Sequence, residues 1–154
     1  MTKVSRGESL LRMVLRRVLP YNRHLYNVRN LGIINPETNQ ELEIDIYVPA
    51  LKLGFEFNGM QHHAEGQKNR DNIKKKICKQ KGITLITIWT YSLLKDDFCK
   101  WLADSYPEIP FKKPKRSFVA DFREACVQYV NSIKKMNKKL NGSREFRVLK
   151  KVNR

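Results

Sequence analysis

The chain has 154 residues, which suits one compact domain with an extension. It contains no apolar run of the roughly 18 residues that cross a bilayer, and its N-terminus lacks the apolar block of a signal peptide. We therefore expect a cytoplasmic or nucleoid-associated protein without a membrane partner. Lys and Arg number 31 against 15 Asp and Glu, and the net charge of +16 predicts a polyanionic partner, because basic side chains displace counterions from phosphates.

The positive charge is concentrated toward the C-terminus. Residues 111–154 carry 14 basic and 3 acidic side chains, a net of +11, whereas residues 1–110 have a net of +5. We expect the C-terminal part to supply affinity for nucleic acid. Charge alone leaves other uses open, namely a solubility tail, a membrane-surface segment or a place among ribosome-associated proteins.

The first part of the chain predicts a helix and a weaker strand. Residues 5–18 have apolar side chains at helical spacing, with Ser5 as N-cap and Glu8 three positions later, as in a capping box. Pro20 ends this helix, because proline removes a backbone donor. Residues 24–31 are the weaker strand candidate.

Two further strands are predicted for residues 41–48 and 51–58, because apolar and polar side chains alternate along both. The apolar face of the first consists of Leu42, Ile44, Ile46 and Val48, opposite Glu41, Glu43 and Asp45. The apolar face of the second consists of Leu51, Leu53, Phe55 and Phe57, opposite Lys52, Gly54, Glu56 and Asn58. Each strand thus presents carboxylates from its less apolar face.

The second part of the chain predicts helices around one buried strand. The predicted elements are a helix over 68–81, a strand over 83–89, a helix over 92–105, a proline-rich basic linker over 107–116 and a helix over 117–140. Gly82 suits a helix C-cap, and Cys78 is expected to pack against the following strand. The fold class is therefore mixed α/β, with a core over 1–106 and a basic helical extension over 117–154.

The helix predicted for 117–140 carries an apolar stripe that leaves its position open. The stripe consists of Phe118, Phe122, Cys126, Val130 and Ile133. It is long enough either to dock on the core or to bind a partner.

Asp45 and Glu56 are candidate metal ligands. They are 11 residues apart, on neighbouring predicted strands. The hard metal ions that promote phosphodiester hydrolysis bind converging carboxylates and keep positions free for water and phosphate. Alternation alone also allows the alternative that both are ordinary solvent-facing side chains.

Two histidines and a polar pair follow these acids. His62 and His63 come shortly after the second strand, and histidine is suited to proton transfer near neutral pH. Asp71 and Lys74 lie one helical turn apart on a shared face. Beside converging carboxylates these residues indicate a catalytic site, although a histidine pair by itself is typical of a surface loop.

Three segments resemble endonucleases of the PD-(D/E)XK superfamily, and in particular the very-short-patch-repair-like branch that includes phage-borne homing endonucleases. They are Ser5–Leu11 (SRGESLL), Asp45–His63 (DIYVPALKLGFEFNGMQHH) and Asp71–Ile88 (DNIKKKICKQKGITLITI). Each segment is a weak signal, but their order and spacing over about half the chain are fairly specific. The resemblance implies a restriction-endonuclease-like mixed sheet flanked by helices, and a location in the host cytoplasm if the protein is phage-encoded.

The resemblance also implies Mg²⁺ as cofactor, with Mn²⁺ expected to substitute. Asp45 and Glu56 would bind the metal, and Glu8 on the first helix would reach the same site. The zinc ligands of mismatch-repair members have no clear counterpart here, so no zinc is predicted.

A catalytic or metal-proximal histidine is implied at His62 or His63, which the sequence does not distinguish, and supporting roles are implied for Asp71 and Lys74. The chain departs from the superfamily motif at Asn58, where a lysine is expected two residues after the second acid. Lys74 on the following helix is a candidate source of that positive charge.

Taken together, these features predict a metal-dependent DNA endonuclease or nickase. The alternatives are a non-catalytic nucleic-acid-binding protein on a decayed nuclease core and a structural or ribosome-associated protein. With one active site per chain, double-strand cleavage requires a homodimer or two sequential nicks. The basic residues expected to contact DNA are Lys75, Lys76, Lys112, Lys113, Lys115 and Arg116.

Overall fold

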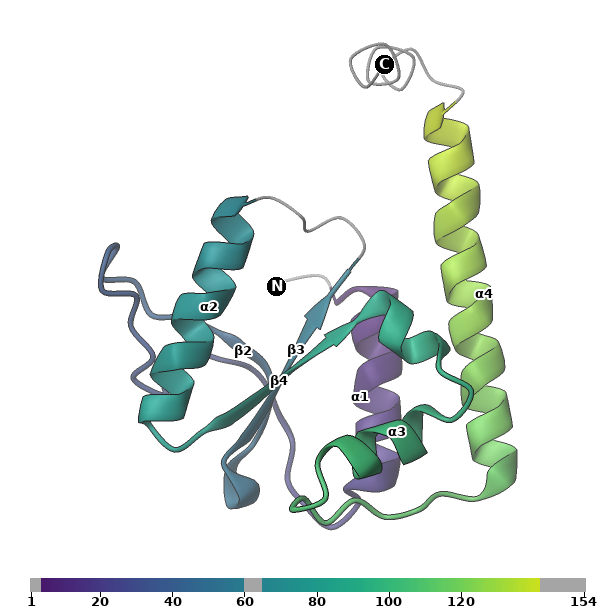
Figure 1. Ribbon diagram of the computed structural model, residues 1–154, viewed down its shortest axis with the longest axis horizontal. Coiled ribbons are helices and arrows are strands. Elements are labelled where there is room, and N and C mark those ends of the chain that lie inside the picture. The colour runs from purple at the N-terminus through teal and green to yellow at the C-terminus, as the bar shows by residue number, and fades with distance from the viewer. Residues whose placement is uncertain (1–3, 60–64, 142–154) are drawn as a thin grey trace.

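Four strands form one mixed sheet that has helices on both faces (Figure 1). The computed structural model describes the backbone of residues 4–59 and 65–141. β1, β2 and β3 are antiparallel neighbours, whereas β4 runs parallel to β3. In sheet order, the strands are β1 (Leu25–Val28), β2 (Ile44–Val48), β3 (Leu53–Asn58) and β4 (Thr84–Trp89). The predicted mixed α/β class is confirmed.

The helices divide between the two faces of the sheet, as Figure 1 shows. One face is covered by α1 (Arg6–Val18), α3 (Phe98–Ser105) and α4 (Arg116–Asn141), and the other by α2 (Glu65–Gln80). Two short 3-10 helices, η1 (Pro49–Leu51) and η2 (Thr90–Leu94), follow β2 and β4. Over the described ranges, no helix has the length and apolar content needed to cross a membrane.

Two helix ends are set by the residues that the sequence indicated. The Ser5 Oγ accepts a hydrogen bond of 3.1 Å from the backbone N–H of Glu8, which confirms the predicted N-cap. After α2, Gly82 has a φ of +75°, and the next N–H, of Ile83, donates to the carbonyl oxygen of Cys78 at 2.8 Å. The predicted C-cap is therefore confirmed. Cys78 is buried with β4 residues, also as predicted.

The side chains of β3 alternate as predicted, whereas those of β2 do not. Phe55 and Phe57 of β3 both pack on the face that α1 covers. In β2, Ile46 joins the same cluster, but Ile44 packs on the opposite face with residues of α2. The prediction that Ile44 and Ile46 share a face is therefore wrong. The alternation shifts at Asp45, and because helices cover both faces, an apolar side chain is buried on either one.

The first turn of α1 lies directly against the sheet at Gly7. A Cβ atom at this position would lie 2.3 Å from Cζ of Phe57 and 2.7 Å from the hydroxyl of Tyr129. A larger residue would require the rings of Phe57 and Tyr129, or α1 itself, to shift. The close approach therefore sets the height of the next residue, Glu8, above the sheet.

The prediction of a single helix over residues 92–105 is wrong. η2 ends at Leu94, and Lys95 has extended backbone angles of φ −59° and ψ 146°. A new helix, α3, begins after Asp97, whose side chain accepts a hydrogen bond of 3.0 Å from the N–H of Lys100. Asp97 is thus an N-cap, and a residue of this type starts a helix rather than continuing one.

The first half of α4 is part of the core, which settles where its apolar stripe docks. Phe122 and Cys126 are buried in the cluster that α1 and α3 form on the sheet. The ring of Phe122 lies 5.8 Å from that of Phe98. The preceding linker is also attached, because the N–H of Lys112 donates to the carbonyl oxygen of Val18 at 2.7 Å. The core therefore continues past the boundary predicted at 107–116.

Candidate active site

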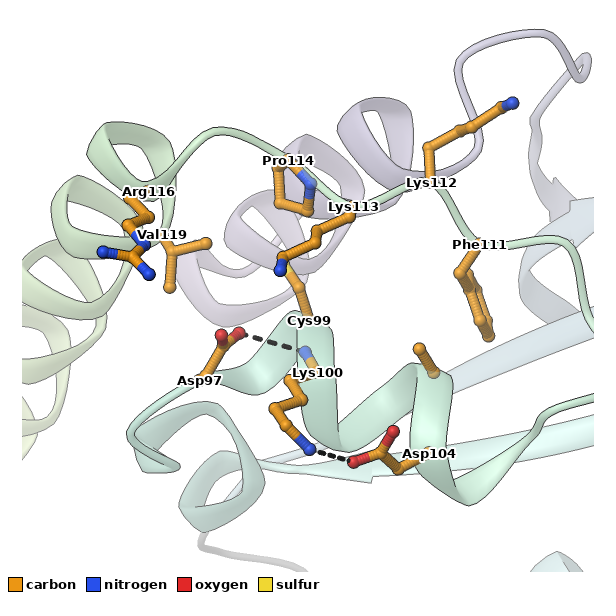
Figure 2. Close-up of a pocket in the computed structure, with 11 residues that line it drawn as sticks. Asp97, Cys99, Lys100, Asp104, Phe111, Lys112, Lys113, Pro114, Arg116 and Val119 are labelled. Carbon is orange, nitrogen blue, oxygen red and sulfur yellow. Dashed lines mark hydrogen bonds and ion pairs between the residues drawn. The ribbon is translucent and has the colours of Figure 1, made fainter.

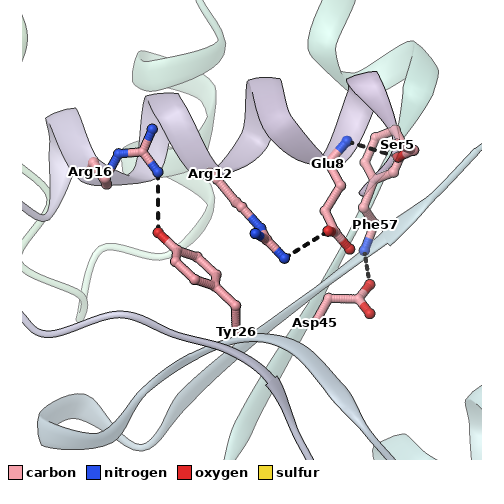
Figure 3. Close-up of polar contacts among 7 residues, drawn as sticks. All are labelled: Ser5, Glu8, Arg12, Arg16, Tyr26, Asp45 and Phe57. Atoms are coloured by element: carbon pink, nitrogen blue, oxygen red, sulfur yellow. Dashed lines mark hydrogen bonds and ion pairs between the residues drawn. The ribbon is translucent and has the colours of Figure 1, made fainter. Parts of the chain in front are cut away.

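Asp45 of β2 and Glu56 of β3 lie side by side. The register pairs Ile46 with Phe55, which places Asp45 next to Glu56. The Asp45 Oδ2 accepts a hydrogen bond of 3.0 Å from the N–H of Phe57, the residue that follows Glu56 (Figure 3). The Glu56 side chain is only 15% exposed. It is therefore not the ordinary solvent-facing side chain that alternation alone allowed.

Glu8 of α1 approaches Asp45, and with a smaller effect Glu43. Figure 3 shows its carboxylate directed from the helix toward Asp45. Burial and then the negative charge of Asp45 raise the pKa of Glu8, while Arg12 opposes the rise. Arg12 holds the carboxylate in place by donating to the Glu8 Oε2 at 3.0 Å. Carboxylates from three elements thus approach one another.

Lys74 brings a positive charge into contact with this group. Its Nζ lies 2.7 Å from the Oε1 of Glu56, and both side chains are 15% exposed. Asn58, two residues after Glu56, is buried, and its backbone carbonyl oxygen accepts a hydrogen bond from the Thr90 hydroxyl at 3.5 Å. The cation at this site therefore comes from α2, where the sequence suggested it.

Arg12 is the site residue that the sequence reasoning missed. Its guanidinium pairs with Glu8 and lies 4.0 Å from the centroid of the Tyr26 ring. The Tyr26 hydroxyl in turn accepts a hydrogen bond of 3.2 Å from Arg16 (Figure 3). The available signal was the spacing of four residues from Glu8, which puts both side chains on one face of a helix.

The acidic pair is electrostatically strained. Burial, followed by the negative charge of Asp45, raises the pKa of Glu56 to about 8, although Lys74 acts in the opposite direction. At neutral pH the pair therefore retains a proton that isolated carboxyls would release. A proton-sharing pair of this kind is a frequent property of functional sites.

This strain predicts that Glu56→Gln stabilises the fold in a pH-dependent way. Because the folded pKa of about 8 lies above the ordinary value of 4.5, wild-type stability from this group is present at low pH and is lost as pH rises through 8. The variant has no such loss. We expect its advantage in free energy of unfolding to grow by up to about 1.4 kcal/mol per pH unit between pH 5 and 8.

Chemical denaturation at several pH values measures this difference. Glu124→Gln is the matched control, since it removes the same charge from an exposed position on α4. If the difference in free energy of unfolding between wild type and Glu56→Gln did not change with pH, the proposed strain in the Asp45–Glu56 pair would be contradicted.

Other predicted site residues are not drawn into the cluster. Asp71 is half-buried on α2, one turn before Lys74, and among the described side chains no hydrogen bond or ion pair joins it to Asp45 or Glu56. His62 and His63 lie outside the described residues. Within residues 4–59 and 65–141, no three His, Cys, Asp or Glu side chains are arranged so that they could hold a metal ion.

The basic residues expected to contact DNA are exposed at two separate places. Lys75 and Lys76 lie on α2, near Lys74. The exposed residues of the linker and of the start of α4 are Lys112, Lys113, Lys115 and Arg116. Most of these line a pocket of about 340 Å³ that also contains Asp97 and Asp104 (Figure 2). The linker is bonded to Val18, ten residues along α1 from Glu8, or about 15 Å along the helix axis.

Comparisons with known proteins identify viral relatives. The chain is 33% identical over 97 residues to uncharacterized protein 094L of Frog virus 3 (isolate Goorha). This aligned region covers 54% of this chain and 61% of that protein. It is 32% identical over 92 residues to uncharacterized protein 033L of Invertebrate iridescent virus 3, covering 52% and 47%. It is also 32% identical over 115 residues to uncharacterized protein 307L of Invertebrate iridescent virus 6, covering 56% of each chain.

No family model matches the chain, and no solved structure matches it. The chain spans between 47% and 61% of the length of these three relatives. It is therefore similar to part of several viral proteins whose names state no activity.

Proposed function

We propose that the chain is a metal-dependent DNA endonuclease or nickase that hydrolyses phosphodiester bonds. The observation that carries the proposal is the approach of Glu8, Asp45 and Glu56 from three elements, with a lysine cation at 2.7 Å from one of them. Burial and the charge of Asp45 raise the pKa of both Glu8 and Glu56, which opposes folding, so this arrangement favours a functional role. The net charge of +16 attracts a phosphate backbone to the same molecule.

The topology supports a restriction-endonuclease-like fold for this proposal. α1 is followed by three antiparallel strands, and α2 then crosses to the parallel strand β4. This is the helix–sheet–helix–strand order that the PD-(D/E)XK resemblance implies. In that arrangement Asp45 and Glu56 take the positions of the two motif acids.

Mg²⁺ fits the donor set that these residues offer. It prefers carboxylate oxygens and is usually held by one or two carboxylates, with water and substrate phosphate completing the coordination. Asp45 and Glu56 supply two, and Glu8 lies beside them. A complete set of three protein ligands is therefore not required. When bound, the ion would neutralise negative charge on the scissile phosphate.

The side chains of the protein have defined roles in this reaction. Lys74 is positioned to stabilise the negative charge that develops on the phosphate during attack by water. The N–H of Phe57 fixes the carboxylate of Asp45, and Arg12 fixes that of Glu8. Because these groups are held before the substrate arrives, little reorganisation is needed during the reaction.

The proposal is tested by incubating supercoiled plasmid with the protein in Mg²⁺, in Mn²⁺ and in EDTA. We expect nicked or linear products with either metal and none with EDTA. A panel of linear, nicked, mismatched and junction DNAs then identifies the preferred substrate. Binding without cleavage on every DNA with both metals would overturn the proposal in favour of a non-catalytic nucleic-acid-binding protein. Tighter binding to structured RNA than to DNA would favour a ribosome-associated role.

A further inference from the structure

A second feature of the molecule lies where the parallel strands β3 and β4 end. A pocket of about 240 Å³ opens there, and it has room for one planar group the size of a nucleobase. Its lining residues include Asn58, Trp89, Tyr91, Leu94, Val130 and Lys134. Ligands of α/β sheets commonly bind beyond the carboxyl ends of the strands. Asn58 is two residues beyond Glu56, which corresponds to about 6.6 Å along the strand.

The pocket has an exposed aromatic surface. Tyr91 is 66% exposed, and its ring is stacked on that of Trp89 with centroids 6.1 Å apart and an interplanar angle of 12°. The turn that carries Tyr91 is held to β3, because the hydroxyl of Thr90 donates to the carbonyl oxygen of Asn58. The turn is therefore attached to β3, while most of the Tyr91 surface is in contact with water. Aromatic rings presented in this way stack on nucleobases with little dependence on sequence.

Charge at the pocket favours the same class of ligand. Lys134 of α4 lines the opening, and further lysines follow it along the exposed side of the helix, at positions 135, 138 and 139. The interior is formed by apolar groups, among them Leu94 and Val130. An apolar slot with an aromatic wall and a cation at its edge matches a nucleotide, which has a flat apolar base and an anionic phosphate.

We propose that this pocket binds an unstacked base of a nucleic acid whose backbone continues to the Asp45–Glu56 site. The inference rests on the proposed nuclease function and narrows its substrate. Within a continuous duplex both faces of each base are covered by neighbours, so a base must leave the stack before it reaches a protein ring. The preferred substrate is accordingly DNA with an unpaired base near the scissile bond, such as a single strand, a flap, a junction or a mismatch.

The test measures binding with cleavage disabled, in the Asp45→Asn background and in EDTA. Fluorescence anisotropy compares a single-stranded oligonucleotide with a duplex of the same sequence. We expect Tyr91→Ala to weaken single-strand binding about tenfold and to change duplex binding less than twofold. Tyr91→Phe keeps the ring and should bind as the parent does. The matched control is Tyr21→Ala, which removes another exposed tyrosine, 85% exposed, in the turn after α1. Because Lys112 Nζ lies 5.5 Å from the centroid of the Tyr21 ring, this variant should change single-strand and duplex binding equally.

A 2-aminopurine base in the single strand reports stacking directly. Its fluorescence should be quenched by the parent protein and not by the Tyr91→Ala variant. An unchanged affinity of that variant, or an equal loss on duplex and single strand, would overturn the inference. Because the measurement needs neither metal nor cleavage, a protein that binds as expected but never cuts would refute the nuclease proposal alone. A protein that cuts but ignores Tyr91 would refute only the base pocket.

Discussion

Asp45→Asn and Glu56→Gln are each expected to lower plasmid cleavage by about 10³-fold or more, while DNA binding stays the same or becomes tighter. Each substitution removes a proposed Mg²⁺ ligand, and the lost stabilisation of charge in the transition state amounts to several kcal/mol. Because the pair already shares a proton at neutral pH, neither substitution adds negative charge where phosphate would bind. Cleavage rates in Mg²⁺ and anisotropy in EDTA separate these two effects.

The matched control for this pair is Glu124→Gln, which makes the same change at an exposed glutamate on α4. This variant should retain cleavage. Loss of activity in Glu56→Gln is not attributable to unfolding, because this variant is expected to be more stable than wild type. Full cleavage in both Asp45→Asn and Glu56→Gln would remove the pair from the active site.

Truncation of the chain after Tyr106 is expected to abolish folding. The deleted part includes Phe122 and Cys126, which are 2% and 0% exposed, and Val130, which is 4% exposed. Their removal uncovers apolar side chains of α1 and α3. Burying one such side chain contributes about 1.5–3 kcal/mol, so three are comparable to the whole stability of a small domain. Circular dichroism should show no cooperative thermal transition.

A shorter truncation after Asn141 is the control. It keeps all of α4 and removes five basic residues and one acidic residue from the sequence. We expect this variant to stay folded and to bind DNA more weakly, with a salt slope lower by about 0.9 for each phosphate that it no longer neutralises. A cooperative transition in the protein ending at Tyr106 would show instead that residues 1–106 fold alone, as the composition of the chain suggested.

Features that depend only on residues adjacent along the chain were predictable from the sequence. The N-cap at Ser5 and the C-cap at Gly82 follow from residue type and position. The alternation of β3 was also predicted correctly. In β2, however, apolar residues at 42, 44, 46 and 48 fit either face. Only the packing of α2 on the second face determines which way each side chain points.

The candidate site was predictable in its residues but not in its energetics. The acids, Glu8 and Lys74 were all indicated by the sequence, since resemblance and spacing identify them. The burial of Glu56 was not, because strand alternation suggested a solvent-facing side chain. Lys74 of α2 contacts it from 18 residues later in the chain, and strand alternation does not reveal such an approach. The position of Arg12 was not predictable either, because its guanidinium lies over the ring of Tyr26, which belongs to a different element.

The packing of α4 on α1 has a consequence for the order in which the protein assembles during synthesis. α1 leaves the ribosome before α4, yet part of its apolar surface is covered by α4, which emerges about a hundred residues later. Contacts between such distant segments form slowly. Until α4 arrives, Tyr129 is not in place beside Gly7, and the support that holds Glu8 near Asp45 is incomplete. A nascent chain therefore lacks the assembled acidic cluster, and the proposed DNA-cutting site forms only after translation has passed α4.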